Sequence, residues 1–155
     1  MPQLSLHSPI GELTLSEDDG AIVALDWGWG RDQEETPLLL EAKAQLNAYF
    51  DGSGENFSLP LRPYGSQFQQ NVWKEMLNIP YGKTMTYGEM AKKLNSAAQP
   101  IGGACGRNPI PIIIPCHRVL ASGGKLGGYT ADGGLEIKRA LLQLEGALEP
   151  SLFTF

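Results

Sequence analysis

Hydrophobic and polar positions alternate along the first part of the chain. Three short segments show this pattern, Leu4–Leu6, Leu13–Leu15 and Ile22–Trp27, and turn residues separate them at Pro9–Gly11 and Asp18–Gly20. Successive side chains of a strand point to opposite faces of a sheet, so a period of two residues is typical of strands with one buried face. The pattern therefore predicts a small antiparallel meander.

A helical period replaces the alternation after Thr36. Pro37 is suited to the first position of a helix, and the apolar residues that follow it recur on one face until about Phe50. The Asp-Gly-Ser-Gly sequence at residues 51–54 ends this helix. A further strand is predicted at Phe57–Leu61.

A stretch containing proline and glycine at residues 62–65 predicts a boundary between a domain of residues 1–62 and a domain of residues 63–155. Residues 1–60 carry two basic and eleven acidic side chains, whereas residues 61–155 carry ten basic and six acidic ones. The net charge of −5 therefore conceals a basic second half, which points to a surface for phosphate. Chance segregation between two subdomains is the alternative, because charge alone does not establish DNA binding.

Helical periods dominate the second half. The tetrapeptides Ser66–Gln69 and Thr86–Glu89 both have the spacing of a capping box, in which two side chains satisfy backbone amides at the start of a helix. Apolar residues at intervals of four continue the first of these helices. The second helix is short, ends at about Leu94, and has Tyr87 in its first turn.

A third short helix is predicted from Pro100 to about Gly106, because proline suits the first helical position. The residue before it, Gln99, is biased away from helical angles. Two short helices joined by a turn form a helix-turn-helix arrangement, whose second helix is the candidate groove reader. Its three glycines each cost about 1 kcal/mol relative to alanine. They leave a face with almost no side chains, suited either to a nucleic-acid backbone or to a closely packed neighbouring helix.

Composition excludes several classes of protein. No apolar stretch is long enough to span a membrane, and Met1–Ser5 has no basic residue of the kind that precedes the apolar core of a secretory signal. The chain has two cysteines, Cys105 and Cys116, and two histidines. We therefore expect a cytoplasmic protein with reduced thiols, no membrane partner, no metal site and no cofactor.

The sequence Pro-Cys-His-Arg-Val at residues 115–119 follows the apolar run Ile110–Ile114. A cysteine thiolate is a strong nucleophile, and a nearby imidazole is the usual means of forming it at neutral pH. A cysteine among isoleucines can equally be an inert buried thiol, because burial raises its pKa. Neighbouring residues of an extended segment point in opposite directions, so contact between Cys116 and His117 requires a turn or a bridging water.

A third group would orient the imidazole, and the last helix offers one. The apolar face of residues 135–144 continues to Glu145, where a carboxylate would be partly desolvated and would face the negative end of the helix dipole. Such a residue usually has a partner. His117 is one candidate, and a structural ion pair with Arg139 or Arg118 is the alternative.

At this point the chain resembles the O6-alkylguanine-DNA alkyltransferases of the bacterial type. The match is best from Phe68 to Gly146. Its signatures are Phe68-Gln69-x-x-Val72-Trp73, Ile79-Pro80-x-Gly82, Thr86-Tyr87, Gly102-x-x-x-Gly106-Arg107-Asn108-Pro109, Ile114-Pro115-Cys116-His117-Arg118-Val119 and Gly128-Tyr129. The resemblance implies a small α/β N-terminal domain, made of a small antiparallel sheet plus a helix, and a mainly helical C-terminal domain containing a helix-turn-helix.

The same resemblance implies direct-reversal DNA repair. A damaged guanine in double-stranded DNA would be flipped out of the duplex, because its O6-alkyl carbon cannot reach a buried thiol from within the base stack. The alkyl group would pass irreversibly to Cys116, with His117, an ordered water and Glu145 as the activating relay. Tyr87 would donate a proton or hydrogen bond to the guanine. A monomer would act once, as a suicide methylated-DNA–protein-cysteine methyltransferase.

The resemblance also assigns binding roles. Asn108 would be the hinge between the groove helix and the cysteine turn. The base pocket would be lined by Tyr129, Thr130 and Val119. The DNA would contact Gln99, Gly102, Gly103, Ala104 and Arg107. Gln99 departs from the family pattern, which usually has an arginine there that inserts into the base stack, and residues 129–134 form a longer stretch than usual.

Two other functions remain open on the residues alone. A cysteine hydrolase that used Cys116, His117 and Glu145 would turn over, and it would need an oxyanion hole that the sequence does not reveal. A lesion-binding protein with weak repair activity is the other possibility, because Gln99 replaces the usual arginine.

Overall fold

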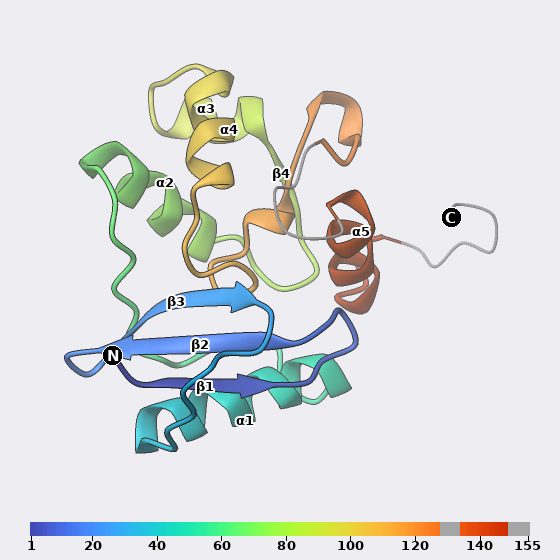
Figure 1. The fold of residues 1–155 in the computed structure, drawn as a ribbon. Helices are drawn as coiled ribbons and strands as arrows, with labels where there is room; N and C mark the ends of the chain where they lie inside the picture. Colours follow the sequence, from blue (N-terminus) through green and yellow to red (C-terminus); the bar gives the residue numbers. More distant parts are fainter. Residues whose placement is uncertain (128–133, 149–155) are drawn as a thin grey trace.

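A computed structural model describes residues 1–127 and 134–148 of the chain (Figure 1). The first half contains an antiparallel sheet of strands β1 (Gln3–Leu6), β2 (Leu13–Asp18) and β3 (Ala21–Trp27), in that order. Each strand contains one of the predicted segments, so the predicted meander is confirmed. A register shift after Ser16 interrupts the pairing of β2 with β3.

Helix α1 (Pro37–Asp51) covers one face of this sheet (Figure 1). Thr36 caps its N-terminus by accepting a hydrogen bond from the backbone amide of Leu39, and Pro37 occupies the first turn. The helix ends at Gly52, whose φ of +85° lies in the left-handed region that glycine adopts without strain. Its buried side chains are Leu39, Ala42, Leu46 and Tyr49.

The predicted strand at Phe57–Leu61 is wrong. Between α1 and the next helix the only pairing with the sheet is around Ile22, whose amide donates to the carbonyl of Pro60 and whose carbonyl accepts from the amide of Arg62. Pro60 has no amide hydrogen and cannot extend a ladder. This segment therefore runs beside β3 with a single isolated bridge, at Leu61.

The second half of the described chain is mainly helical, as expected. Both predicted capping boxes are present, at Ser66 with Gln69 and at Thr86 with Glu89. Trp73 donates from its indole nitrogen to the carbonyl of Ala104 at 3.0 Å, which ties α2 to α4. The helices are α2 (Gln67–Leu77), α3 (Tyr87–Lys93), α4 (Ala98–Gly106) and α5 (Leu135–Leu144).

Helix α4 begins at Ala98, two residues earlier than predicted. Gln99 is therefore helical, and the expectation that Pro100 would hold it out of the helix is wrong. Amides in the first turn have no acceptor within the helix, so a proline there removes no hydrogen bond. Ala97 provides no side-chain cap, which leaves the start of this helix weakly fixed.

The reactive pentapeptide forms a short turn rather than an extended segment. Cys116–Arg118 is a 3-10 turn, labelled η1, which lies next to strand β5 (Val119–Leu120). Strand β5 pairs in parallel with β4 (Met85–Thr86), directly before α3. A second 3-10 turn, η2, spans Ser122–Gly124. The pairing of β4 with β5 therefore places the first turn of α3 beside the reactive turn.

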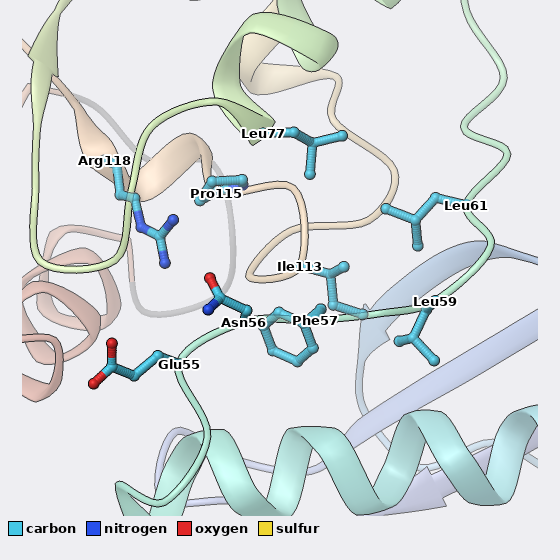
Figure 2. A pocket seen from close by; sticks show the side chains of 9 residues that line it. All are labelled: Glu55, Asn56, Phe57, Leu59, Leu61, Leu77, Ile113, Pro115 and Arg118. Atoms are coloured by element: carbon cyan, nitrogen blue, oxygen red, sulfur yellow. The ribbon is translucent and has the colours of Figure 1, made fainter.

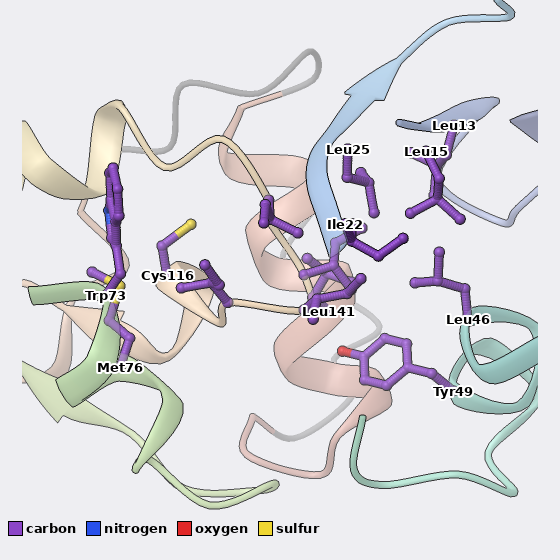
Figure 3. Packing of buried hydrophobic residues seen from close by; sticks show 14 of the residues in the cluster. Leu13, Leu15, Ile22, Leu25, Leu46, Tyr49, Trp73, Met76, Cys116 and Leu141 are labelled. Atoms are coloured by element: carbon purple, nitrogen blue, oxygen red, sulfur yellow. The ribbon is translucent and has the colours of Figure 1, made fainter. Parts of the chain in front are cut away.

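One hydrophobic core joins the two halves of the molecule (Figure 3). Cys116 lies within this core and is 5% exposed. Among residues 1–127 and 134–148, no helix is long and apolar enough to cross a membrane. The core includes Leu13, Leu15, Ile22, Leu25, Leu46, Tyr49, Trp73, Met76, Cys116 and Leu141.

Candidate active site

Asn108 fixes the path of the chain into the reactive turn. Its side-chain amide donates to the carbonyl of Ile114 at 2.8 Å, and its side-chain oxygen accepts from the amide of Ile110 at 2.9 Å. Between these contacts, Ile112 has a φ of +75°, a strained conformation for a β-branched residue. The amide of Cys116 donates to the same Ile114 carbonyl at 2.8 Å. Asn108 therefore braces a tightly folded loop that ends at Cys116.

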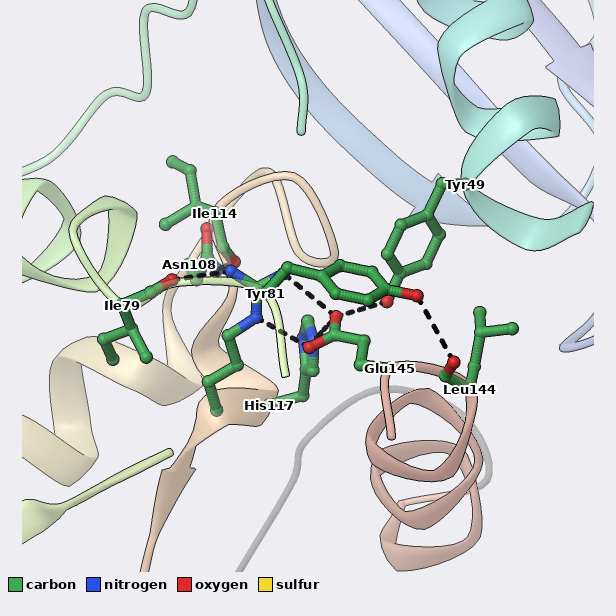
Figure 4. A network of polar contacts seen from close by, with 9 residues as sticks. Tyr49, Ile79, Tyr81, Asn108, Ile114, His117, Leu144 and Glu145 are labelled. Atoms are coloured by element: carbon green, nitrogen blue, oxygen red, sulfur yellow. Dashed lines mark hydrogen bonds and ion pairs between the residues drawn. The ribbon is translucent and has the colours of Figure 1, made fainter. Parts of the chain in front are cut away.

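His117 is fully buried, and its Nε2 lies 2.6 Å from Oε2 of Glu145 (Figure 4). An ionised carboxylate only accepts hydrogen bonds, so Nε2 carries the proton and Nδ1 is the bare acceptor of a neutral ring. Nδ1 makes no hydrogen bond to the described part of the chain. Burial lowers the pKa of His117, which keeps the imidazole neutral and available as a base at Nδ1.

Glu145 accepts hydrogen bonds from both halves of the molecule. Arg118 binds it with two nitrogens, Nε to Oε1 at 2.8 Å and Nη2 to Oε2 at 3.0 Å. Tyr49, on α1, donates its hydroxyl to Oε2 at 2.5 Å. Burial alone would raise the pKa of Glu145, but the hydrogen bonds from His117 and Arg118 lower it to about 2. Of the partners weighed for this carboxylate, which were His117 and either Arg139 or Arg118, both His117 and Arg118 bind it.

Two members of the site have no counterpart among the sequence-based predictions. Tyr49 is one, since nothing in the helical stripe of α1 reveals that its hydroxyl reaches a residue 96 positions away. Lys138 is the other: it is fully buried, and its Nζ donates to the carbonyl of Val119 at 2.7 Å. Lys138 lies three residues before Leu141, on the apolar face of α5, so its position on that face was a usable signal.

Tyr87, in the first turn of α3, lies near Cys105 and Cys116. Burial raises its pKa to about 12, with a further contribution from Cys105 and Cys116, so its hydroxyl remains a donor at neutral pH. Nζ of Lys138 lies 5.7 Å from the centre of its ring. Burial likewise raises the pKa of Cys105 to about 12, which makes that thiol a poor nucleophile.

The glycine-rich loop after the reactive turn passes beside Tyr87. Gly127 has a φ of +71°, and a Cβ there would lie 3.3 Å from the ring of Tyr87. Gly127 therefore lies directly against the ring of Tyr87. Two predicted pocket residues, Tyr129 and Thr130, lie outside the described residues.

Helix α4 presents an open glycine face. A Cβ built on Gly102 or Gly103 meets no atom of the described residues within 4 Å, so neither glycine is required for packing against a neighbouring helix. Gln99 and Arg107 are exposed at the two ends of this helix. Ala104 differs, because it is 2% exposed and packs inward. The open face favours the close-approach interpretation over tight helix packing.

A cavity of about 100 Å³ lies behind the reactive turn (Figure 2). Its walls come from the segment between α1 and α2 and from the turn, including Pro115 and Arg118. The N-terminal half therefore faces the turn across this cavity, and it reaches Glu145 through Tyr49. Within the described ranges 1–127 and 134–148, no three His, Cys, Asp or Glu side chains lie close enough to hold a metal ion.

Together these features describe a helix-turn-helix protein in which a buried cysteine directly precedes a histidine that is held by a glutamate. The family model of the 6-O-methylguanine DNA methyltransferase ribonuclease-like domain matches residues 4–63, and the model of the DNA binding domain of the same methyltransferase matches residues 67–147. The chain belongs to the 6-O-methylguanine DNA methyltransferase family.

Relatives match over nearly their whole length. The methylated-DNA–protein-cysteine methyltransferase of Methanosarcina acetivorans is 43% identical over 151 residues, which are 91% of this chain and 96% of that protein. The protein of the same name from Mycobacterium tuberculosis is 42% identical and covers 97% of this chain and 95% of its own length. The solved structure of Mycobacterium tuberculosis OGT in complex with DNA has a TM-score of 0.86 at 42% identity, covering 95% of this chain and 94% of that one.

Proposed function

We propose that this protein repairs alkylated DNA by direct reversal, transferring the O6-alkyl group of guanine irreversibly to Cys116. The observation that carries the proposal is the neutral His117, with its bare Nδ1, held by Glu145 directly after a buried cysteine. Relatives named methylated-DNA–protein-cysteine methyltransferase, at 42–43% identity and high coverage, support the same activity.

The reaction begins with a proton transfer. His117 accepts the thiol proton of Cys116 at Nδ1, directly or through water, and Glu145 stabilises the imidazolium that forms. The thiolate attacks the alkyl carbon attached to O6 of guanine. A carbon–sulfur bond forms as the carbon–oxygen bond breaks, and the electron pair stays on the guanine. Tyr87, which remains protonated at neutral pH, donates to the base and makes it a better leaving group.

The thioether has no route back to a thiol in this scheme, so each chain acts once. We assign the chemistry and DNA contact to residues 63–155, and assign residues 1–62 to a supporting domain. The glycine face of α4 lies against DNA, with Gln99 and Arg107 at its ends. Ala104 has no part in this contact, because its side chain packs inward and its carbonyl accepts from Trp73. The solved DNA complex of the Mycobacterium tuberculosis relative supports DNA as the partner.

Stoichiometry tests this function. A duplex carrying O6-methylguanine is titrated with the protein, and restored guanine is counted by digestion of the DNA. The proposal predicts one guanine restored per chain, followed by a complete stop. Many equivalents per chain would indicate a hydrolase, and binding without restoration would indicate a lesion-binding protein.

A further inference from the structure

Tyr49 stands outside the mechanism described above, yet it contacts the relay directly. Its hydroxyl donates to Oε2 of Glu145 at 2.5 Å, and this is the oxygen that holds His117. We propose that Tyr49 is a positioning residue through which the N-terminal half sets the basicity of His117. The effect on alkyl transfer rests on the proposed function, whereas the effect on the His117 ring does not.

Three donors share one carboxylate oxygen. Oε2 accepts from Tyr49 at 2.5 Å, from His117 at 2.6 Å and from Arg118 at 3.0 Å, whereas Oε1 accepts from Arg118. A carboxylate oxygen has about two lone-pair sites, so these donors compete for its negative charge. The Tyr49 hydroxyl therefore weakens the attraction between this oxygen and a protonated His117. Its removal makes the imidazolium more favourable.

The phenol is a donor, and its place is fixed by packing. Burial, and then the charge of Glu145, raise the pKa of Tyr49, so the hydroxyl keeps its proton. The ring contacts Phe50, Phe57 and Tyr81, with centroids 5.2, 5.4 and 6.2 Å away. Phenylalanine at position 49 preserves these ring contacts and removes only the hydroxyl.

The other charged and titratable groups around His117 remain in place in this variant. Arg118 and Lys138 both oppose its protonation, and among the described side chains only Glu145 favours it. Loss of the Tyr49 hydroxyl strengthens that single favourable contribution. The charged and titratable groups around His117 come from the reactive turn, α5 and its C-terminal end, α1 and the segment after α2. They are Cys116, Arg118, Lys138, Glu145, Tyr49 and Tyr81.

The experiment compares Tyr49→Phe with Tyr81→Phe and the unmodified protein. Tyr81 is a matched control, because it lies in the same network (Figure 4) but donates its hydroxyl to the backbone carbonyl of Leu144 at 3.3 Å. Single-turnover alkyl transfer from free O6-benzylguanine is measured from roughly pH 4 to pH 8, because burial moves the pKa of His117 below the ordinary histidine range. Because only neutral His117 accepts the thiol proton, the rate falls on the acid side. For Tyr49→Phe this acid limb moves to higher pH by about half a unit to one unit, whereas Tyr81→Phe leaves it in place.

A uniform loss of rate at every pH in Tyr49→Phe would mean a purely structural role and would overturn the proposal. An unchanged acid limb, or one displaced to lower pH, would do the same. The ring nitrogens of His117 give a readout that needs no substrate. With ¹⁵N-labelled histidine there are two ring systems, and the exposed His7 is the internal reference. Protonation at Nδ1 of His117 begins at higher pH in Tyr49→Phe, and identical titrations in the two proteins would refute the inference even if no alkyl transfer occurs.

Discussion

Adding one methyl group to the open face of α4 separates DNA contact from protein stability. The change is Gly103→Ala, at an exposed position where φ is not positive and a new Cβ meets nothing within 4 Å in the part of the chain that the structure describes. Alanine is favoured over glycine inside a helix by about 1 kcal/mol, so the free energy of unfolding should rise by that amount. For a chain of this size the melting temperature should rise by about 2–4 °C.

The same methyl group should weaken DNA binding. Where the glycine face meets the nucleic-acid backbone, an extra carbon forces the two surfaces apart, and such overpacking costs about 1–3 kcal/mol. A loss of 1.4 kcal/mol is a tenfold loss of affinity, so we expect Gly103→Ala to bind duplex DNA roughly tenfold more weakly at constant salt. Alkyl transfer from free O6-benzylguanine should be unaffected, because the small base needs no groove.

Thermal unfolding and fluorescence anisotropy with a labelled duplex measure the two effects. Asn47→Ala is the control, because it raises helix propensity on the exposed side of α1, away from α4. A more stable Gly103→Ala protein with unchanged DNA affinity would refute the assignment of this face to DNA. A less stable protein would show that the glycine is needed for packing instead.

Three further results are expected. Glu145→Gln should slow alkyl transfer and lower the free energy of unfolding by roughly 1–3 kcal/mol, and an unchanged single-turnover rate in the folded variant would return Glu145 to a structural role. Gln99→Arg should tighten binding to lesion-containing duplex and speed repair there, because a planar cation fills the gap left by a flipped base; an equal change with free O6-benzylguanine would place Gln99 in the pocket or the fold. The free energy of unfolding should decrease as pH falls below about 6.5, by up to about 1.4 kcal/mol per pH unit. The reason is that His117 takes up a proton in the unfolded chain at a pH where the buried ring stays neutral. The His117→Gln variant should not show this dependence of the unfolding free energy on pH. Denaturant titrations at several pH values that gave the same slope for both proteins would contradict its assignment to His117.

The parts of the fold that were predicted correctly are those that depend on local sequence signals. The alternation in the first strands and the two capping boxes depend on neighbouring residues, so the sequence alone places them correctly. The prediction of a strand at Phe57–Leu61 was wrong because it rested on the pattern of apolar residues alone, whereas Pro60 has no backbone amide hydrogen to donate to a neighbouring strand. Strands β4 and β5 have two residues each, too few for any pattern, and their pairing depends on segments 34 positions apart.

The residues of the candidate site also differ in whether local sequence signals could predict them. The pentapeptide pointed to Cys116 and His117, and the buried carboxylate of Glu145 was expected from the apolar face around it. Tyr49 could not be foreseen, because its role depends on how α1 packs against the far end of α5. The true start of α4, and hence the helical Gln99, depended on whether a first-turn proline would be tolerated, which the local preference of the residue before a proline does not decide.

The most direct test of the central claim is the mass of each cysteine peptide after reaction with duplex DNA carrying O6-methylguanine. Cys116 and Cys105 are the only two thiols, and burial raises the pKa of Cys105 to about 12. Irreversible transfer predicts one added methyl group, an increase of about 14 Da, on the peptide containing Cys116 in every reacted chain. A methyl group on Cys105, or continued repair by Cys116→Ser, would contradict the account.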